Sequence, residues 1–193
     1  MDPIGLIVEI GGTLDQLGVP WVLGGSMASS FAGEPRATMD VDVAVRMSAN
    51  DVTALIAAVT PHFYASEPMI RSAVASRSSF NLIRLADSMK VDVFVLGDDL
   101  LDRRQLERRQ LVSIPTATGS TDIWVGAPDD QILRKLRWFR DGGEASDRQW
   151  RDVIGLLRVQ AGRIDLTELV ATADQLALGD LARRAVAEGA GGS

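Results

Sequence analysis

The sequence has no cysteine and only one histidine, His62. The absence of cysteine excludes disulfide bonds, thiolate catalysis and cysteine zinc sites together. A single histidine makes histidine metal centres and Ser/His/Asp triads improbable. Carboxylate side chains are therefore the remaining candidates for chemistry.

The sequence also lacks an apolar run that approaches the roughly 20 residues needed to span a bilayer, and its start lacks the basic stretch of a secretory signal. We therefore expect a cytoplasmic protein with no membrane partner. Acidic residues outnumber basic ones: the sequence has 26 Asp and Glu and 20 Lys and Arg, which gives a net charge of -6. This balance disfavours broad binding of nucleic acid but still allows a local basic groove that holds an RNA end.

The length of 193 residues is enough for one core, or for a core with a small appended bundle. Helical and strand patterns alternate up to residue 126, and two of the strands read as a hairpin with its turn at Asp87 and Ser88. The expected helices cover residues 4–17, 26–31, 52–59 and a short segment beyond 97–99, and the expected strands cover 20–23, 41–45, 79–86, 89–96, 110–115 and 122–125.

No strand pattern recurs after residue 126. Helices are expected from Pro128 or Asp129 to Arg140, after a cap at Ser146 up to residue 160, and in two shorter segments opened by Asp165 and Leu178. The fold class is thus α/β (α+β), with a mixed α/β domain over residues 1–126 and a helical C-terminal domain over 127–193.

Two acidic residues, Asp40 and Asp42, interrupt an apolar strand. Residues two apart in a strand share a face, so both carboxylates point together while Val41 and Val43 fill the opposite face. Two ionised acids this close repel one another and resist burial, and a bound divalent cation relieves both costs. Asp92, set among β-branched residues of a later strand, completes a three-carboxylate cluster if the two strands are neighbours. Hard oxygen ligands of this kind suit Mg²⁺ or Mn²⁺.

A glycine turn, Gly24-Gly25-Ser26, connects a strand to a short helix ahead of these acids. Magnesium and manganese ions take part of their oxygen ligands from substrate phosphates, so the acids predict a phosphate-bearing ligand. The glycines allow close backbone approach, and the helix N-terminus that follows offers unpaired N–H groups to phosphate. Ser26 either adds its hydroxyl to this cradle or only caps the helix.

The order of these motifs resembles the DNA-polymerase-β-like nucleotidyltransferase superfamily. Its pattern is an apolar strand, Gly-Gly or Gly-Ser, a spacer, Asp-x-Asp and a third acid on a later strand. The corresponding segments here are Gly24-Gly25-Ser26, Asp40-Val41-Asp42 and Val91-Asp92-Val93. The resemblance is closest to small bacterial minimal nucleotidyltransferases, including the AbiEii-like toxins of toxin–antitoxin pairs. It implies a mixed-sheet nucleotidyltransferase core followed by a helical domain.

The resemblance further implies two-metal transfer of a nucleoside monophosphate from an NTP such as ATP to an acceptor hydroxyl, with release of pyrophosphate. Asp40, Asp42 and Asp92 would be the catalytic residues and would hold Mg²⁺ or Mn²⁺. The acceptor implied is a tRNA or other RNA, a protein or a small molecule, and a toxin would have an antitoxin partner. Nucleotide phosphates would contact Gly24, Gly25, Ser26, Arg36 and Lys135.

Other interpretations of these residues remain open. Asp40 and Asp42 also suit a water-exposed strand end whose acids pair with Arg36 and Arg46. Lys135 also suits a solvated basic helix face, and an intrahelical pair with Arg148 at i, i+4 explains Asp152 without any site.

Two further functions are compatible with the same motifs. One is a noncatalytic nucleotide-binding or partner-binding protein on this fold, although a binding role makes no demand for three converging carboxylates. The other is an adenylyltransferase of the antibiotic-modifying type, which shares the chemistry and differs in its small-molecule acceptor.

Overall fold

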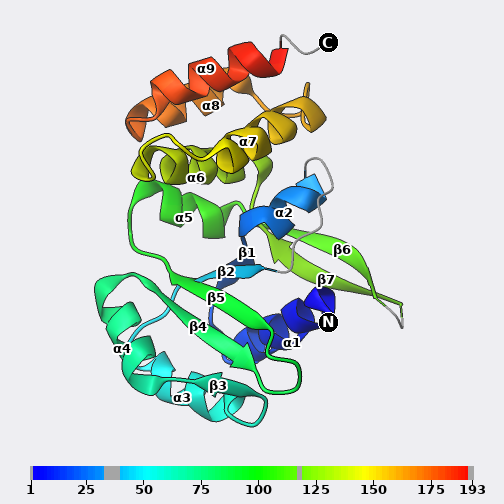
Figure 1. Ribbon diagram of the computed structural model, residues 1–193, viewed down its shortest axis with the longest axis vertical. Helices are drawn as coiled ribbons and strands as arrows, with labels where there is room; N and C mark the ends of the chain where they lie inside the picture. Colours follow the sequence, from blue (N-terminus) through cyan, green and yellow to red (C-terminus); the bar gives the residue numbers. More distant parts are fainter. Residues whose placement is uncertain (1, 33–39, 117–118, 191–193) are drawn as a thin grey trace. The chain divides into compact units, whose positions relative to one another are not determined.

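The computed structural model describes residues 2–32, 40–116 and 119–190 (Figure 1). The described chain has a mixed α/β fold, which confirms the predicted fold class, and it divides into two compact units. The first unit holds the described residues up to Met27 and from 40 to 126. The second holds residues 28–32 and those from Ala127 onward.

The first unit is built on a mixed sheet with the strand order β3-β4-β5-β2-β1-β7-β6. In this sheet β1 pairs antiparallel with β2, and β2 pairs parallel with β5. The strands are β1 (Trp21–Leu23), β2 (Val41–Val45), β3 (Phe63–Ala65), β4 (Ser79–Arg84), β5 (Lys90–Val95), β6 (Gln110–Thr116) and β7 (Gly119–Val125). The expected hairpin of the two strands around Asp87 and Ser88 is formed by β4 and β5.

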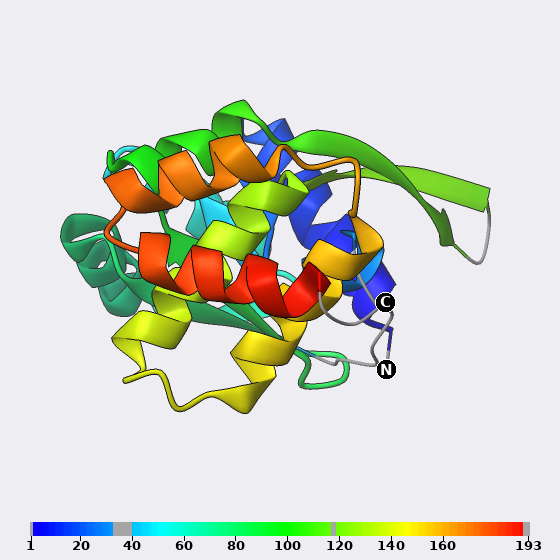
Figure 2. The ribbon, with the colours of Figure 1, turned by 90° about the horizontal axis from the view of Figure 1, so that it is seen from above.

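The hairpin of β6 and β7 extends as a ribbon away from the rest of the sheet (Figures 1 and 2). It joins β1 through a single register pair, Leu23 with Val125. Ile114 and Ile123 are nevertheless only 1% and 2% exposed, so the inner part of the ribbon contributes to the core. Two-stranded hairpins are only marginally stable alone, and this anchoring supplies the missing burial.

Five helices belong wholly or partly to the first unit, and their ends follow ordinary capping chemistry. The side chain of Asp2 accepts a 2.9 Å hydrogen bond from the Gly5 amide, Pro3 follows at the first helical position, and Gly18 adopts a φ of 67° just beyond the helix end. The helices are α1 (Pro3–Gln16), α2 (Gly25–Ala32), α3 (Asp51–Val59), α4 (Glu67–Ser76) and α5 (Leu100–Glu107).

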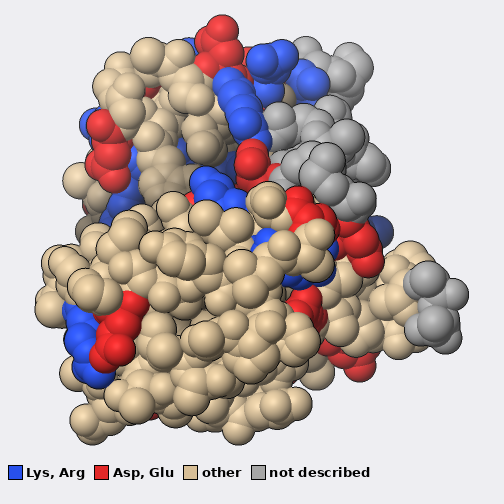
Figure 3. Space-filling model, turned by 60° about the horizontal axis from the view of Figure 1, so that its bottom comes forward, with Lys and Arg blue, Asp and Glu red and all other residues tan. Residues whose placement is uncertain are grey.

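The larger core of the first unit lies on one face of its sheet, and a smaller buried cluster of Val22, Ala44 and Leu96 lies on the other. Alternate valines of β2 and β5 are at most 4% exposed, and they share this core with buried apolar residues of α1 and α3. α3 has one charged residue, Asp51, and the side of the unit where α1 and α3 lie is mostly uncharged (Figure 3).

One helix has no counterpart among the sequence-based expectations. α4 buries Ile70, Ala73 and Val74, which stand at the i, i+3 and i+4 spacing of a helix, and it has a proline in its first turn. It ends at Arg77, which adopts a left-handed conformation with a φ of 52° that more often marks glycine. The signal for α4 was therefore present in the sequence and was missed.

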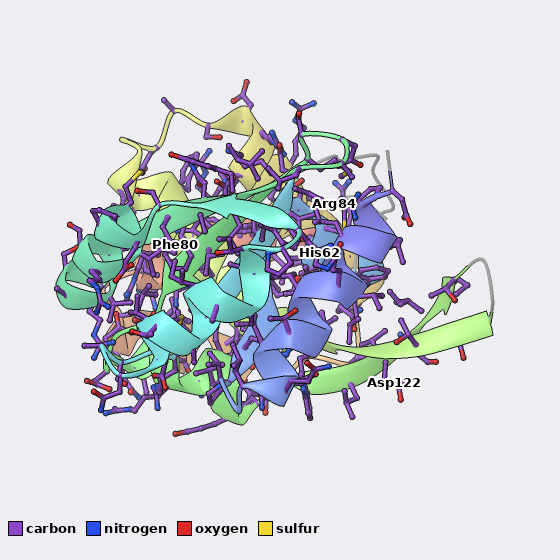
Figure 4. The ribbon with its side chains drawn as sticks, turned by 90° about the horizontal axis from the view of Figure 1, so that it is seen from below. His62, Phe80, Arg84 and Asp122 are labelled. Atoms are coloured by element: carbon purple, nitrogen blue, oxygen red, sulfur yellow. The ribbon has the colours of Figure 1, made fainter. Side chains whose placement is uncertain are left out.

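Arg84 fixes the turn between β4 and β5. Its guanidinium donates to both carboxylate oxygens of Asp87, at 3.0 and 2.8 Å, and lies 3.4 Å from Oε2 of Glu9 on α1. Arg84 and His62 lie beside the same cavity of about 580 Å³ (Figure 4). The charged groups of this cavity are matched to one another, so it is not our candidate site.

Acid should unfold the protein partly through Asp87. The hydrogen bond from Arg84 is the main cause that lowers the pKa of Asp87 below its ordinary value of 3.8. The unfolded chain therefore takes up this proton first, and the stabilisation is present above pH 3.8 and is lost as the pH falls through the folded-state pKa. We expect Asp87→Asn to reduce the pH dependence of the unfolding free energy below about pH 4. Urea unfolding between pH 2 and 6 checks this, and an unchanged acid limb in the variant would contradict it.

The second unit is helical throughout its described residues apart from turns (Figure 2). Ser146 and Asp165 cap their helices as predicted, since Ser146 accepts from the Gln149 amide and Asp165 from those of Thr167 and Glu168. Trp150 is 8% exposed, and its ring lies 5.2 Å from that of Phe139. The helices are α6 (Pro128–Asp141), α7 (Asp147–Val159), α8 (Leu166–Gln175) and α9 (Gly179–Ala190).

Across the described ranges, no helix combines the length and the apolar character that crossing a membrane requires.

Candidate active site

Two acids meet on adjacent strands of the first unit. β2 and β5 run parallel with Asp42 directly opposite Asp92. Neighbouring strands lie about 4.8 Å apart, and register partners point to the same face of the sheet. The three-carboxylate prediction depended on these two strands being neighbours, and they are. The face that carries the two acids is the one opposite the valine core.

Asp40 is exposed and directly precedes β2. Among the residues that the structure describes, no group of three acidic or histidine side chains is arranged to hold a metal ion. Oδ2 of Asp92 lies 2.8 Å from the Nζ atom of Lys90. A positive charge of the chain itself stands beside the carboxylate that a metal would bind.

Lys90 is a charged residue beside the candidate site that sequence reasoning missed. Its pKa is raised above 10.5, first by the hydrogen bond to Asp92, and then, against desolvation, by the charges of Asp92, Asp40 and Asp42. All three predicted ligands therefore act on one ammonium group. The signal was present in the sequence, because Lys90 stands two residues before Asp92 on one strand and so shares its face.

The glycine turn brings backbone and carboxylate together. The Gly24 amide donates a 2.9 Å hydrogen bond to the Asp42 carbonyl oxygen, and α2 begins at Gly25 with a φ of 62°. A Cβ atom on Gly25 would lie 2.6 Å from Cγ of Asp42, far inside van der Waals contact. The Asp42 carboxylate thus lies against the bare Cα of Gly25, at the N-terminus of a helix. This is the close approach for which glycine is required.

Ser26 is 8% exposed and is the second residue of α2. Because Gly25 has a φ of 62° and is not in helical conformation, both predicted roles of Ser26, in the phosphate cradle or as the helix cap, stay predictions. Arg36, the other predicted phosphate contact of this part of the chain, lies outside the described residues.

Lys135 lies in the second unit and is buried rather than solvated. Its side chain is 3% exposed, and its Nζ atom lies 2.8 Å from Oδ2 of Asp152, whose side chain is 14% exposed. The solvated-face interpretation is therefore wrong for Lys135, and Asp152 has a partner on another helix in addition to any on its own. The contact of Lys135 with a triphosphate stays a prediction.

Solved structures show which proteins have a similar fold. An antigenic nucleotidyltransferase-like protein from Paracoccidioides brasiliensis aligns with a TM-score of 0.52 and 14% identity, covering 94% of this chain and 91% of that one. The chain has a nucleotidyltransferase fold. ANT(2'')-Ia in complex with adenylyl-2''-tobramycin aligns with a TM-score of 0.50 and 12% identity, covering 93% of this chain and 96% of that one.

No protein-family model and no curated protein matches the chain. At the identities above, the likeness concerns the nucleotidyltransferase fold alone. The predicted mixed-sheet core is confirmed at that level, whereas membership of the AbiEii-like group stays a prediction.

Proposed function

We propose that this protein is a metal-dependent nucleotidyltransferase that moves a nucleoside monophosphate from an NTP to an acceptor hydroxyl. The observation that carries the proposal is the position of Asp42, which is in register with Asp92 and lies against Gly25 at the start of α2. The two carboxylates thus lie beside the N-terminus of α2, where we propose that the phosphates bind. Carboxylates and phosphates are both anionic, so they repel one another unless cations lie between them.

The donor set fits Mg²⁺ or Mn²⁺. Carboxylate oxygens are hard ligands, and Asp42 and Asp92 supply them from one face of adjacent strands, with Asp40 directly before β2. The Nζ atom of Lys90 lies 2.8 Å from Oδ2 of Asp92, which supports a cation at this point. When bound, the ions would supply Lewis-acid charge to the phosphates and activate the acceptor hydroxyl.

The chain's own groups would then bind the phosphates, orient the acceptor hydroxyl and accept its proton. The Gly25 and Ser26 amides, at the start of α2, donate to the β- and γ-phosphate oxygens, while the Gly24 amide stays bonded to the Asp42 carbonyl oxygen. Asp92 accepts the proton of the acceptor hydroxyl while the hydroxyl oxygen attacks the α-phosphorus. The bond from that phosphorus to the oxygen of the β-phosphate breaks, and pyrophosphate leaves. Arg36 and Lys135 are our predictions for further triphosphate contacts.

Transfer of label tests this proposal. The protein is incubated with each α-labelled NTP and Mg²⁺ or Mn²⁺, in separate arms with RNA, protein and small-molecule pools. We expect label on one pool, and a fall to background with a chelator or in Asp42→Asn, which keeps the side-chain volume and loses the charge. Asp122→Asn, an exposed acid on β7, is the matched control and should transfer normally. Label that persists unchanged in Asp40→Asn, Asp42→Asn and Asp92→Asn would reject the site.

The arms of this experiment also separate the acceptor classes. Label on RNA or protein favours a toxin with an antitoxin partner, as the AbiEii-like resemblance predicts. Label on a small molecule favours an antibiotic-type adenylyltransferase, which accords with the fold shared with the tobramycin-bound ANT(2'')-Ia. Nucleotide binding without transfer to any pool favours the noncatalytic alternative.

A further inference from the structure

The chain has only two lysines, and both form ion pairs. Of 20 basic residues only Lys90 and Lys135 are lysines, and the remainder are arginines. Each lysine lies 2.8 Å from an aspartate oxygen. The pair of Lys135 is buried, whereas the side chain of Lys90 is 48% exposed and that of its partner Asp92 is 22% exposed. Lys90 is thus a cation at the surface of the candidate site.

We propose that Lys90 is a built-in counter-cation that holds Asp92 until a divalent ion displaces it, and that it thereby lowers the affinity of the site for that ion. This inference rests on the proposed function, because it assumes that Asp92 is a metal ligand. Before a divalent ion binds, Asp92 pairs with the ammonium of Lys90. Binding of the ion then exchanges this ammonium for the ion.

The geometry favours such an exchange. Lys90 and Asp92 stand on the same strand and the same face, so the pair forms without any rearrangement of the sheet. Exposed ion pairs contribute little to stability, so a half-exposed lysine can leave at low cost. An ammonium group on a four-carbon stem is also easier to displace than the planar fork of an arginine, which grips a carboxylate bidentately.

The charges around Lys90 point the same way. Asp42 is in register with Asp92, and Asp40 directly precedes the strand of Asp42, so further negative charge lies near this ammonium. Lys90 offsets part of the repulsion among these carboxylates. Removing the ammonium should therefore increase the demand of the cluster for an external cation.

Direct titration with Mn²⁺, followed by electron paramagnetic resonance of the free ion, tests the inference. We expect Lys90→Met, which keeps the length of the side chain and loses its charge, to bind Mn²⁺ about tenfold more tightly, or about 1.4 kcal/mol. Lys90→Arg should bind no more tightly than the natural protein. Arg71→Met is the matched control, because Arg71 pairs with Glu67 at 47% exposure elsewhere in the unit, and it should leave the affinity unchanged.

Nuclear magnetic resonance of lysines carrying ¹³C-methyl groups gives a second measurement. Reductive methylation keeps the positive charge, and loss of one signal in Lys90→Met assigns Lys90. We expect Mg²⁺ to shift the Lys90 signal over the concentration range in which it competes with Mn²⁺. Neither measurement requires catalysis, so absence of label transfer would reject the proposed function without touching this inference.

Three results would overturn the inference. They are an equal or weaker Mn²⁺ affinity in Lys90→Met, a Lys90 signal that saturating Mg²⁺ does not move, and no Mn²⁺ binding in either protein. Lys90→Gln serves as a second neutral variant, and circular dichroism confirms that each variant is folded.

Discussion

Replacing Gly25 by alanine is expected to abolish nucleotide transfer and to lower the free energy of unfolding by about 2–4 kcal/mol. Two costs add at this position. The residue has a φ of 62°, which strains any residue with a Cβ, and the new methyl carbon would lie 2.6 Å from Cγ and 2.9 Å from Cβ of Asp42. Asp42 would have to leave its place opposite Asp92. Urea unfolding and the label-transfer assay measure the two effects.

Two other glycines provide matched controls. A Cβ on Gly24 would meet nothing nearer than the Asp42 carbonyl oxygen at 3.8 Å, so Gly24→Ala should change stability by less than about 1 kcal/mol. Gly12 lies exposed in α1 with nothing within 4 Å of such a Cβ, and Gly12→Ala should gain up to about 1 kcal/mol and transfer normally.

A double variant separates strain from clash. Asp42→Ala in the Gly25→Ala background removes the contact but not the positive φ, so it should recover part of the lost stability and none of the transfer. Stability of Gly25→Ala equal to that of the natural protein would show that the Asp42 carboxylate does not pack there.

The acids and the glycine turn could be predicted because each is a local pattern. Alternation along one strand predicts that Asp40 and Asp42 share a face, although β2 begins only at Val41, and a Gly-Gly pair between strand and helix marks a turn. The contact of Asp42 with Gly25 could not be predicted. It depends on the backbone of Gly24 pairing with that of Asp42 across 18 residues of chain, with a positive φ that the sequence permits but does not impose.

The neighbour relation of β2 and β5 was also beyond the sequence alone. These strands are separated along the chain by α3, β3, α4 and β4, and only the assembled order of the sheet sets Asp42 opposite Asp92. The burial of Lys135 was hidden for a related reason. Its partner Asp152 lies on the next helix, and a local pattern of basic residues does not reveal which of them faces a buried carboxylate.

The pair of Lys135 with Asp152 should dominate the stability of the second unit. Asp152→Asn is expected to lower the free energy of unfolding by about 3–5 kcal/mol, because it leaves a buried ammonium without its counter-charge. Asp180→Asn is the matched control: Asp180 accepts from Arg140 at 2.7 Å in the same unit, but its side chain is 67% exposed, so the effect should be small. Equal effects of the two variants would contradict a buried pair.

A double variant can also decide what Lys135 does. Replacing both partners, as Lys135→Met with Asp152→Leu, removes both charges and should restore most of the stability that Asp152→Asn loses. A folded protein without Lys135 then isolates its role towards the nucleotide. If Lys135 contacts the triphosphate, the double variant should bind NTP at least tenfold more weakly, and transfer should fall with it. If the double variant binds NTP and transfers label like the natural protein, Lys135 serves only to hold α6 against α7, and the predicted phosphate contact is wrong.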